Sequence, residues 1–459
     1  MNERKSNKLE APVTVVLGSQ LPLCIDPIHD ENPDYNPFEH RRLEHPTTNG
    51  ETLAHLLKGS LGSGILAMPL AFAHAGLWFG LGAMIIVGFI CTYCIHMLVK
   101  CEHKMCRRTK TPSFGYAELA ASVFANGPEM LHKWSRFAGW VINTFIVMTL
   151  FGCCCVYNVF VATNLKQVIE HYADFNYDLR WYIALMLPFL IVINLIRNLK
   201  SMAWFSVIAN IFVSLCLVVT AYYIFRDGLP TPSERLPVAD YHKMPLFFGT
   251  AVFALEAIGV VMTLENNMKT PQNFIGCPSV LNIGMFVVVV LYTTVGFFGY
   301  WKYGDETKGS ITLNLPTEEL LAQSVKLMIA SAIFLTYCLQ FYVPMNIIWT
   351  SIRDKFPEKN KELAEYVTRF TLITLTVALA VAIPTIGPFM SLIGAVCVST
   401  LGFMFPAAIE ILTYYKRPGF GTLKWILVKD ILLILFGVAG FVIGTYVSIL
   451  EINQTLTEL

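Results

Sequence analysis

The sequence has little charge for its length. Only 14% of its 459 residues are Asp, Glu, Lys or Arg, whereas soluble domains average about 25%. Hydrophobic residues make up 55% of the chain, and the formal net charge is +1. The low charge excludes an ordinary soluble protein. The near-zero net charge gives no global field that would attract nucleic acid.

Several signatures of catalysis are missing as well. The chain has no paired CxxC spacing for a metal, no glycine-rich phosphate loop after a strand, and no nucleophile with a matching base. We therefore expect no metal site, no cofactor, no ATP-driven pumping and no enzyme activity. Most of the 12 cysteines, including Cys153, Cys154 and Cys155, lie in apolar stretches, where we expect them to pack as small apolar side chains.

About eleven apolar stretches are long enough, at roughly 20 residues each, to cross a bilayer. Their uninterrupted runs lack the alternation of a membrane β-barrel, so the predicted fold class is an all-α polytopic membrane protein. Residues 1–51 are polar and predict a disordered tail without a cleavable signal peptide. The predicted segments are 52–74 (broken at 59–64), 78–99, 139–165, 181–196, 202–225, 245–268, 279–301, 323–352, 367–384, 387–414 and 426–449.

Lys and Arg are divided unevenly between the two sides of these segments. The side of the N-terminal tail holds 24 of them and the opposite side holds 8. The positive-inside rule therefore predicts a cytoplasmic N-terminus. With eleven segments, residues 451–459 form a short extracellular or luminal tail. Asn453, in the only Asn-x-Ser/Thr triplet, falls on that side as a candidate glycosylation site close to the membrane.

The first segment carries the strongest functional signal, because glycines interrupt it from Gly59 through Gly62 to Gly64. Glycine weakens a helix by about 1 kcal/mol relative to alanine, and a broken membrane helix is tolerated mainly where it lines a cavity. The N–H groups near Ser63, Gly64 and Ile65 would meet a carboxylate, and the carbonyls near Gly59 would meet a cation. An amino acid carries both charges.

A second irregular segment lies five spans later. Around Phe253, Ala254 and Ala257, segment 245–268 carries an acid, Glu256, in mid-membrane. Two irregular helices at corresponding places predict an inverted-repeat transporter with its site between the repeats. Residues 52–225 would form the first repeat, 245–414 the second, and 426–449 an extra helix. Glu256 could meet the substrate ammonium, join the two broken segments or carry a proton. Alternatively, it bonds to freed backbone N–H groups as a structural acid.

Other polar residues within or near the segments have competing interpretations. His55 could serve as a proton switch, or it could be a satisfied core or interfacial histidine. Glu265, near the inner end of its segment, is expected to be solvated or to cap a loop. Tyr157, Tyr337 and Gln340 are further candidates for the pocket wall, although helix packing would also explain each of them.

These stretches resemble the proton-coupled amino acid transporters of the amino acid/auxin permease group, and its insect members most closely. The resemblance runs from Thr52 to Tyr446 and rests on HLLKGSLGSGILAMPLAFAHAG, FGCCCVYNVFVATNLKQVIE, FLIVINLIRNLKSMAWFSVIAN, PLFFGTAVFALEAIGV, GSITLNLP and YCLQFYVPMNI. It implies a LeuT-like fold of two inverted five-helix repeats plus one helix, and symport of protons with glycine, alanine or proline. It also places the proton-responsive histidine on His55 and the unwound stretch on Gly59 to Gly64.

The chain departs from this family at a few positions. Where many members have FEGIG, residues 255–259 of this chain read LEAIG, with Leu255 in place of phenylalanine and Ala257 in place of the first glycine. Where they have PLEN, residues 263–266 read TLEN, with Thr263 in place of proline. Ala257 would narrow the pocket or stiffen the break, which leaves the substrate range open. The chain also lacks the loop cysteines of the family's exofacial disulfide, so that bridge should be absent.

The expected function is therefore uptake of small neutral amino acids into the cytosol by alternating access, with the proton as coupling ion. The residues alone leave sodium open. The alternative is an amino acid sensor with little flux, which would signal to a cytoplasmic partner through its tail. Tyr35 to Phe38 form a tyrosine-based sorting pattern. Both the plasma membrane and the lysosomal or endosomal membrane fit these expectations.

Overall fold

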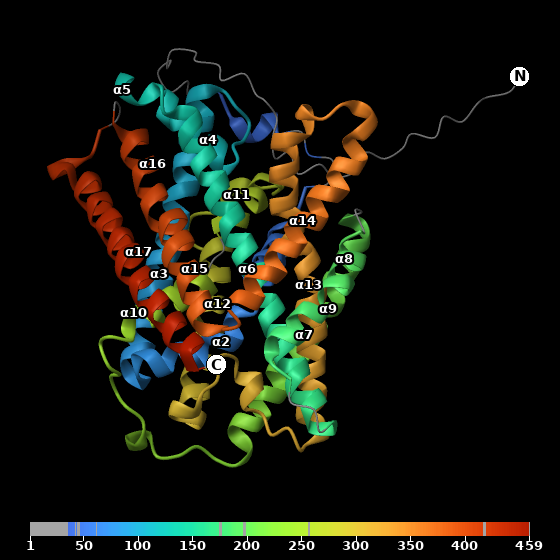
Figure 1. The fold of residues 1–459 in the computed structure, drawn as a ribbon. Helices are drawn as coiled ribbons and strands as arrows, with labels where there is room; N and C mark the ends of the chain where they lie inside the picture. Colours follow the sequence, from blue (N-terminus) through green and yellow to red (C-terminus); the bar gives the residue numbers. More distant parts are fainter. Residues whose placement is uncertain are drawn as a thin grey trace, which may run out of the picture.

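The computed structural model describes residues 35–458 except 42, 44–45, 61, 174–176, 196–198, 256–257 and 416–418. This part of the chain is helical, and its only bridge of β type joins Thr47 to Met268. The helices, which run mostly up and down in Figure 1, are α1 Asn49–Ser60, α2 Gly64–Ala75, α3 Leu77–Thr109, α4 Tyr116–Ala125, α5 Glu129–His132, α6 Ser135–Tyr172, α7 Leu179–Leu185, α8 Leu187–Asn194, α9 Leu199–Arg226, α10 Met244–Ala254, α11 Ile258–Asn266, α12 Val280–Tyr303, α13 Leu320–Ile352, α14 Lys361–Ala382, α15 Gly387–Ile393, α16 Phe405–Tyr414 and α17 Trp425–Glu458.

The predicted segments coincide with these helices. Within the described ranges, nine helices are long and apolar enough to cross a membrane, and the bent pair α1 and α2 makes a tenth span. The predicted segment 181–196 falls on α7 and α8, which together form a shorter apolar helix over Leu179–Asn194. The all-helical polytopic class is confirmed, whereas the eleventh crossing and the repeat boundaries stay predictions.

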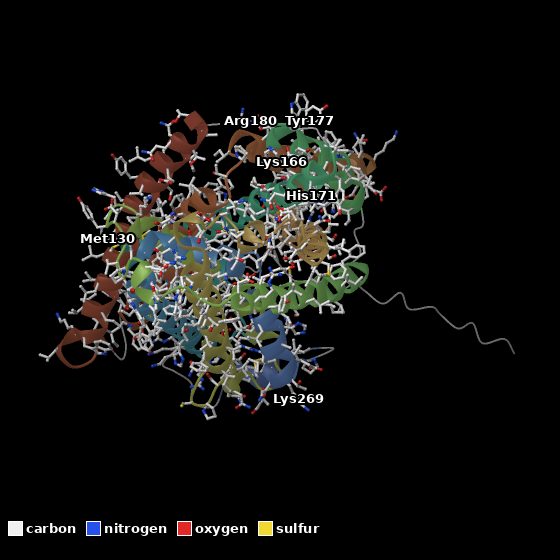
Figure 2. All side chains as sticks on the ribbon, turned by 90° about the horizontal axis from the view of Figure 1, so that it is seen from below. Met130, Lys166, His171, Tyr177, Arg180 and Lys269 are labelled. Atoms are coloured by element: carbon white, nitrogen blue, oxygen red, sulfur yellow. The ribbon has the colours of Figure 1, made fainter. Side chains whose placement is uncertain are left out.

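Loops predicted on opposite sides of the membrane lie at opposite ends of the molecule. In Figure 1, α4 and α5 lie at the top, and the loop between α9 and α10 lies at the bottom with the C-terminus. Figure 2 views the molecule from below, with Arg180 labelled near its upper edge and Lys269 near its lower edge. This arrangement is the one expected for helices that cross back and forth.

The first predicted segment is broken where the glycines predict it. α1 ends at Ser60, α2 begins at Gly64, and the two helices meet at an angle of 55°. The second irregular segment divides into α10 and α11, with Leu255 in a turn after α10. Glu256 and Ala257 lie outside the described residues, so their predicted roles are untested.

Helix α10 lies at the centre of the packing, against α2, α15 and α17. It also contacts a π-helical stretch, Gly394–Val398, which is followed by a second one at Thr400–Met404. A Cβ added to Gly394 would lie only 1.9 Å from the carbonyl oxygen of Gly249 in α10. The sequence did not predict these π-helical turns, which often occur at functional sites.

The end of the segment predicted as a disordered tail is bound to the helices. Pro37–His40 form a 3₁₀ helix that the Asn36 side chain caps by accepting from the Phe38 N–H. Thr47 exchanges backbone hydrogen bonds with the α11 end, accepted by Asn267 at 2.8 Å and donated by Lys269 at 2.9 Å. The structure therefore differs from the predicted tail after residue 34. The preceding residues, 1–34, lie outside the described part.

We predict that Gly394→Ala lowers the apparent melting temperature of the purified protein by several degrees. The added methyl group would overlap the Gly249 carbonyl, and overpacking of this kind costs about 1–3 kcal/mol. Gly82→Ala is the control, because a Cβ there meets no atom within 4 Å. If the Gly394→Ala protein had the same melting temperature as the wild type, this would contradict the close packing of α10.

Candidate functional site

The break between α1 and α2 is buried and polar. Ser60 and Ser63 are 4% and 2% exposed. The Ser60 Oγ atom has no hydrogen-bond partner among the described residues. No side chain in this part of the chain caps the start of α2, whose N-cap is Ser63. The first N–H groups of a helix carry partial positive charge, so this uncapped end is suited to bind an anion such as a carboxylate.

Two tyrosines of other helices lie beside the break between α1 and α2. The Tyr292 hydroxyl of α12 donates to the carbonyl oxygen of Ser60 at 2.6 Å and holds the last turn of α1. The Tyr157 hydroxyl of α6 faces Gly62 and Ser63, and a Cβ on Gly62 would lie 3.7 Å from it. Tyr157 thus lies beside the glycine break, and its predicted place in the pocket wall stays a prediction.

The two irregular segments touch one another. A Cβ on Gly64 would lie 2.9 Å from both the Cα and the Cβ of Ala254, at the end of α10. Ile65, Phe253 and Ala254 are all buried. The structure thus brings together Gly64, predicted to bind the carboxylate, and Ala254, predicted to bind the ammonium. Only a residue without a side chain fits at position 64, which explains why the sequence has glycine there.

Other predicted residues lie away from this meeting point. His55 is exposed on α1 and interacts with Glu51, one helical turn before it. Gly59 is exposed, and its nearest neighbour for an added Cβ is Val260 of α11, at 3.6 Å. Asn453 is exposed in the last turns of α17. The roles predicted for these residues stay predictions.

The two candidates on α13 differ in their surroundings. The Tyr337 hydroxyl lies 2.7 Å from the Thr376 hydroxyl of α14 and forms a hydrogen bond with it, so that side chain joins two helices. Gln340 is half-buried one turn later. Tyr337 therefore has a packing partner in this conformation, which is the alternative that the sequence left open.

Sequence reasoning missed two features of the site. Tyr292 lies within an apolar segment, and no pattern in the sequence shows that its hydroxyl faces a broken helix. Asn158, next to Tyr157, is 1% exposed, and both polar atoms of its amide lack hydrogen-bond partners among the described residues. A polar side chain in mid-membrane is the one signal that could have marked Asn158.

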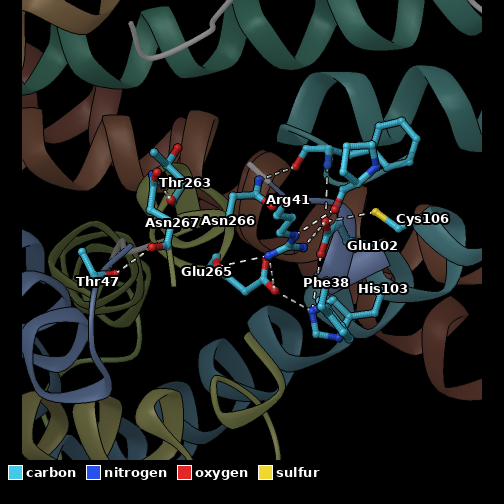
Figure 3. A network of polar contacts seen from close by, with 12 residues as sticks. Phe38, Arg41, Thr47, Glu102, His103, Cys106, Thr263, Glu265, Asn266 and Asn267 are labelled. Carbon is cyan, nitrogen blue, oxygen red and sulfur yellow. Dashed lines mark hydrogen bonds and ion pairs between the residues drawn. The ribbon is translucent and has the colours of Figure 1, made fainter. Parts of the chain in front are cut away.

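A network of charged side chains joins the end of α11 to α3 (Figure 3). The prediction that Glu265 is solvated is wrong, because its side chain is 0% exposed and pairs with Arg41 at 3.1 Å. Ligand atoms of Glu102, His103 and Glu265 lie within 4.8 Å of one another, a spacing that could hold a metal ion. Arg41, however, donates to both carboxylates, so a guanidinium already supplies the cation there.

The whole membrane part of the chain matches a known family. Residues 45–450 match the family model described as transmembrane amino acid transporter protein. The chain belongs to this family. It is 46% identical over 425 residues to the Drosophila melanogaster protein named proton-coupled amino acid transporter-like protein pathetic, covering 93% of this chain and 89% of that protein. The resemblance to proton-coupled amino acid transporters, insect members in particular, is therefore confirmed.

A more distant relative also matches the chain, and one solved structure shares its fold. The chain is 29% identical to the Saccharomyces cerevisiae protein named vacuolar amino acid transporter 3, over 87% of this chain and 56% of the yeast protein. Its fold is similar to that of Mhp1, a nucleobase-cation-symport-1 family transporter solved in a closed conformation with bromovinylhydantoin bound. The TM-score is 0.52 at 12% identity, with 93% of this chain and 95% of Mhp1 covered. The fold is thus LeuT-like, and the chain is a transporter and not an enzyme.

We predict that Tyr292→Phe lowers amino acid uptake about fivefold to tenfold at unchanged surface abundance. The substitution removes the hydroxyl that holds the Ser60 carbonyl, and one lost hydrogen bond of this kind costs about 1 kcal/mol. Thr294→Val on the same helix is the control, because the Thr294 hydroxyl bonds only to its own helix at Val290. Equal uptake by the wild type and Tyr292→Phe would remove Tyr292 from the site.

Proposed function

We propose that this family member is a symporter that carries small neutral amino acids and protons into the cytosol by alternating access. The observation that supports it most is the buried, uncapped start of α2 at the α1–α2 break, against the end of α10. In this proposal the substrate carboxylate binds the N–H groups around Ser63, Gly64 and Ile65. Its ammonium faces the carbonyls near Gly59 and of Phe253 and Ala254.

The close packing at the break supports a small substrate side chain in this proposal. Phe253 and Ala254 are buried beside the glycine break, and Gly64 leaves no space between α2 and α10. We therefore assign glycine, alanine and proline as the substrate class, with Phe253 and Ala257 limiting side-chain size. The printed names of the Drosophila and yeast relatives refer to amino acid transport, which agrees with this class at the coarser level.

The coupling ion in the proposal is the proton. The name of the Drosophila relative refers to proton coupling, and the family histidine matches His55. In the proposal, His55 and Glu256 take part in coupling, and protons enter from the more acidic extracellular or luminal side. The N-terminus lies in the cytosol, and the protein resides in the plasma membrane or in a lysosomal or endosomal membrane.

The direct test of the proposal is electrical. Oocytes that express the chain are clamped and given alanine, proline and glycine at acidic and neutral pH, with sodium present or replaced. We expect an inward current that grows with acidity and does not depend on sodium. A current that requires sodium would overturn proton coupling. Binding without current, at confirmed surface abundance, would instead favour the sensor function through a tail-bound partner.

We predict that His55→Ala abolishes proton-driven accumulation of these substrates, because it removes the one titratable group of α1 assigned to coupling. The measurement is concentrative uptake at acidic external pH. His171→Ala, at the end of α6, is the control and should accumulate substrate like the wild type. A His55→Ala protein with normal pH-dependent uptake would remove His55 from the mechanism, whatever the substrate.

A further inference from the structure

The described residues from Tyr35 to Thr48, here called the N-terminal segment, are attached to both broken segments and to the helices around them. Through Thr47 it bonds to the loop after α11, and it leads directly into α1. Arg41 of this segment donates its Nε–H to the carbonyl of Pro112, in the loop between α3 and α4, at 2.8 Å. Asn266 at the end of α11 donates to the carbonyl of Phe114 in the same loop. These bonds join α1 and α11 to α3.

Arg41 is the centre of this junction (Figure 3). Its side chain is 3% exposed and pairs with two carboxylates that are 0% exposed, Glu102 of α3 at 3.3 Å and Glu265 of α11 at 3.1 Å. The Nε2–H of His103 donates to Glu265 Oε1 at 2.7 Å and lies 3.6 Å from Glu102 Oε2. The ring edge of Phe38 covers His103, with the ring centroids 4.9 Å apart.

The charges in this cluster do not balance without a proton. Glu102 and Glu265 are two buried acids, and among the described residues Arg41 is the one permanent cation that bonds to them. In each acid the Oε2 atom has no hydrogen-bond partner in the described part of the chain. An unbalanced buried charge costs several kcal/mol, and two adjacent carboxylates favour binding of a proton. Burial and the neighbouring Glu265 carboxylate raise the pKa of Glu102, so the two acids can share a proton that solvated carboxylates would lose.

Among the described residues, no second Lys or Arg side chain is seen to bond to Glu102 or Glu265. Glu102 also accepts from the Cys106 Sγ–H and the Phe114 N–H, both at 3.3 Å. His96, two turns before His103 on α3, is half-buried and interacts with it electrostatically. Tyr35 donates to the Lys110 carbonyl, and partial burial with Cys106 nearby raises the pKa of its hydroxyl. The proton is thus the charge that completes the cluster.

We propose that Arg41, Glu102, His103 and Glu265 form a proton-binding site that holds the N-terminal segment against the helices and keeps this end of the transporter closed. With one proton shared by Glu102 and Glu265, the cluster has one negative charge, which the Arg41 guanidinium balances. When the proton leaves, one negative charge is unpaired, and the bound segment is weakened. Stability of the closed arrangement is therefore present at low pH and is lost as pH rises.

This inference rests on the proposed function for its meaning in transport, where the site lies on the cytosolic side. Release of the proton into the cytosol would then free α1 and α11 to move and let the substrate leave. The site would thus link release of the proton to opening of the cytosolic end, whereas substrate enters from the opposite end. The binding site itself does not depend on which amino acid is carried.

A protease assay tests the site without any transport. Purified protein in lipid nanodiscs is digested briefly with trypsin at about pH 6 and about pH 8, and cleavage after Arg41 is followed by mass spectrometry. Docked Arg41 is buried and protected, whereas the Arg353 side chain, 51% exposed, gives the reference rate at each pH. Relative cleavage should be roughly tenfold slower at pH 6, since one linked proton shifts an equilibrium by up to about tenfold per pH unit.

Three variants separate the proton site from general packing. Glu102→Gln removes the acid whose pKa is raised and leaves one carboxylate for Arg41, so cleavage should be slow at both pH values. Glu265→Gln removes one negative charge and should make cleavage slow at both. His132→Gln, whose ring bonds only locally at Gly127, should keep the wild-type pH ratio. Wild-type ratios in both Glu102→Gln and Glu265→Gln, or no pH effect in the wild type, would overturn the proposal.

A transport measurement then separates this proposal from the proposed function. Alanine exchange is measured in inside-out patches or oriented vesicles while only the pH on the N-terminal side is changed. The wild type should slow several-fold as that side is acidified, and Glu102→Gln should lose the effect. Equal slowing of the two proteins would overturn the role of the site in opening while leaving proton symport intact. Absence of proton-coupled current in the wild type would overturn the proposed function, whatever the protease assay gives.

Discussion

The structure depends on one requirement: backbone groups freed inside a membrane helix must find partners. Breaking the first helix between Ser60 and Gly64 frees carbonyls at the end of α1 and N–H groups at the start of α2. Tyr292 satisfies the Ser60 carbonyl, while the start of α2 stays uncapped in the described part. A substrate carboxylate would supply the missing partner, so the same feature that weakens the fold can provide binding energy for transport.

The contacts of the two broken helices also restrict how their halves can move. Gly64 touches Ala254, so α2 and α10 cannot separate without opening the meeting point of the two broken segments. At the other end, α1 and α11 are tied to α3 through Arg41 and its two carboxylates. The halves of each broken helix are thus held by different partners. A fold of this kind can open at one end while the other end stays closed, as alternating access requires.

The sequence predicted the features that follow from composition and local backbone chemistry. Apolar length located the helices, and the glycines from Gly59 to Gly64 located the break, because both effects are local. It failed where contacts join distant parts of the chain. The sequence predicts that Glu265 is solvated or caps a loop, because its partner, Arg41, lies 224 residues away in a segment with a disordered composition. Tyr292 and the π-helical turn at Gly394 were missed for the same reason, since only packing reveals them.

The most direct test of this account is to see where the substrate binds. A cryo-electron microscopy map of the protein in nanodiscs, with the amino acid that gives the largest current, would locate it. We expect density at the break, with the carboxylate on the N–H groups of Ser63, Gly64 and Ile65 and the side chain toward Phe253. Density elsewhere, for example in the polar cavity beside Arg369, with an empty break would contradict the account.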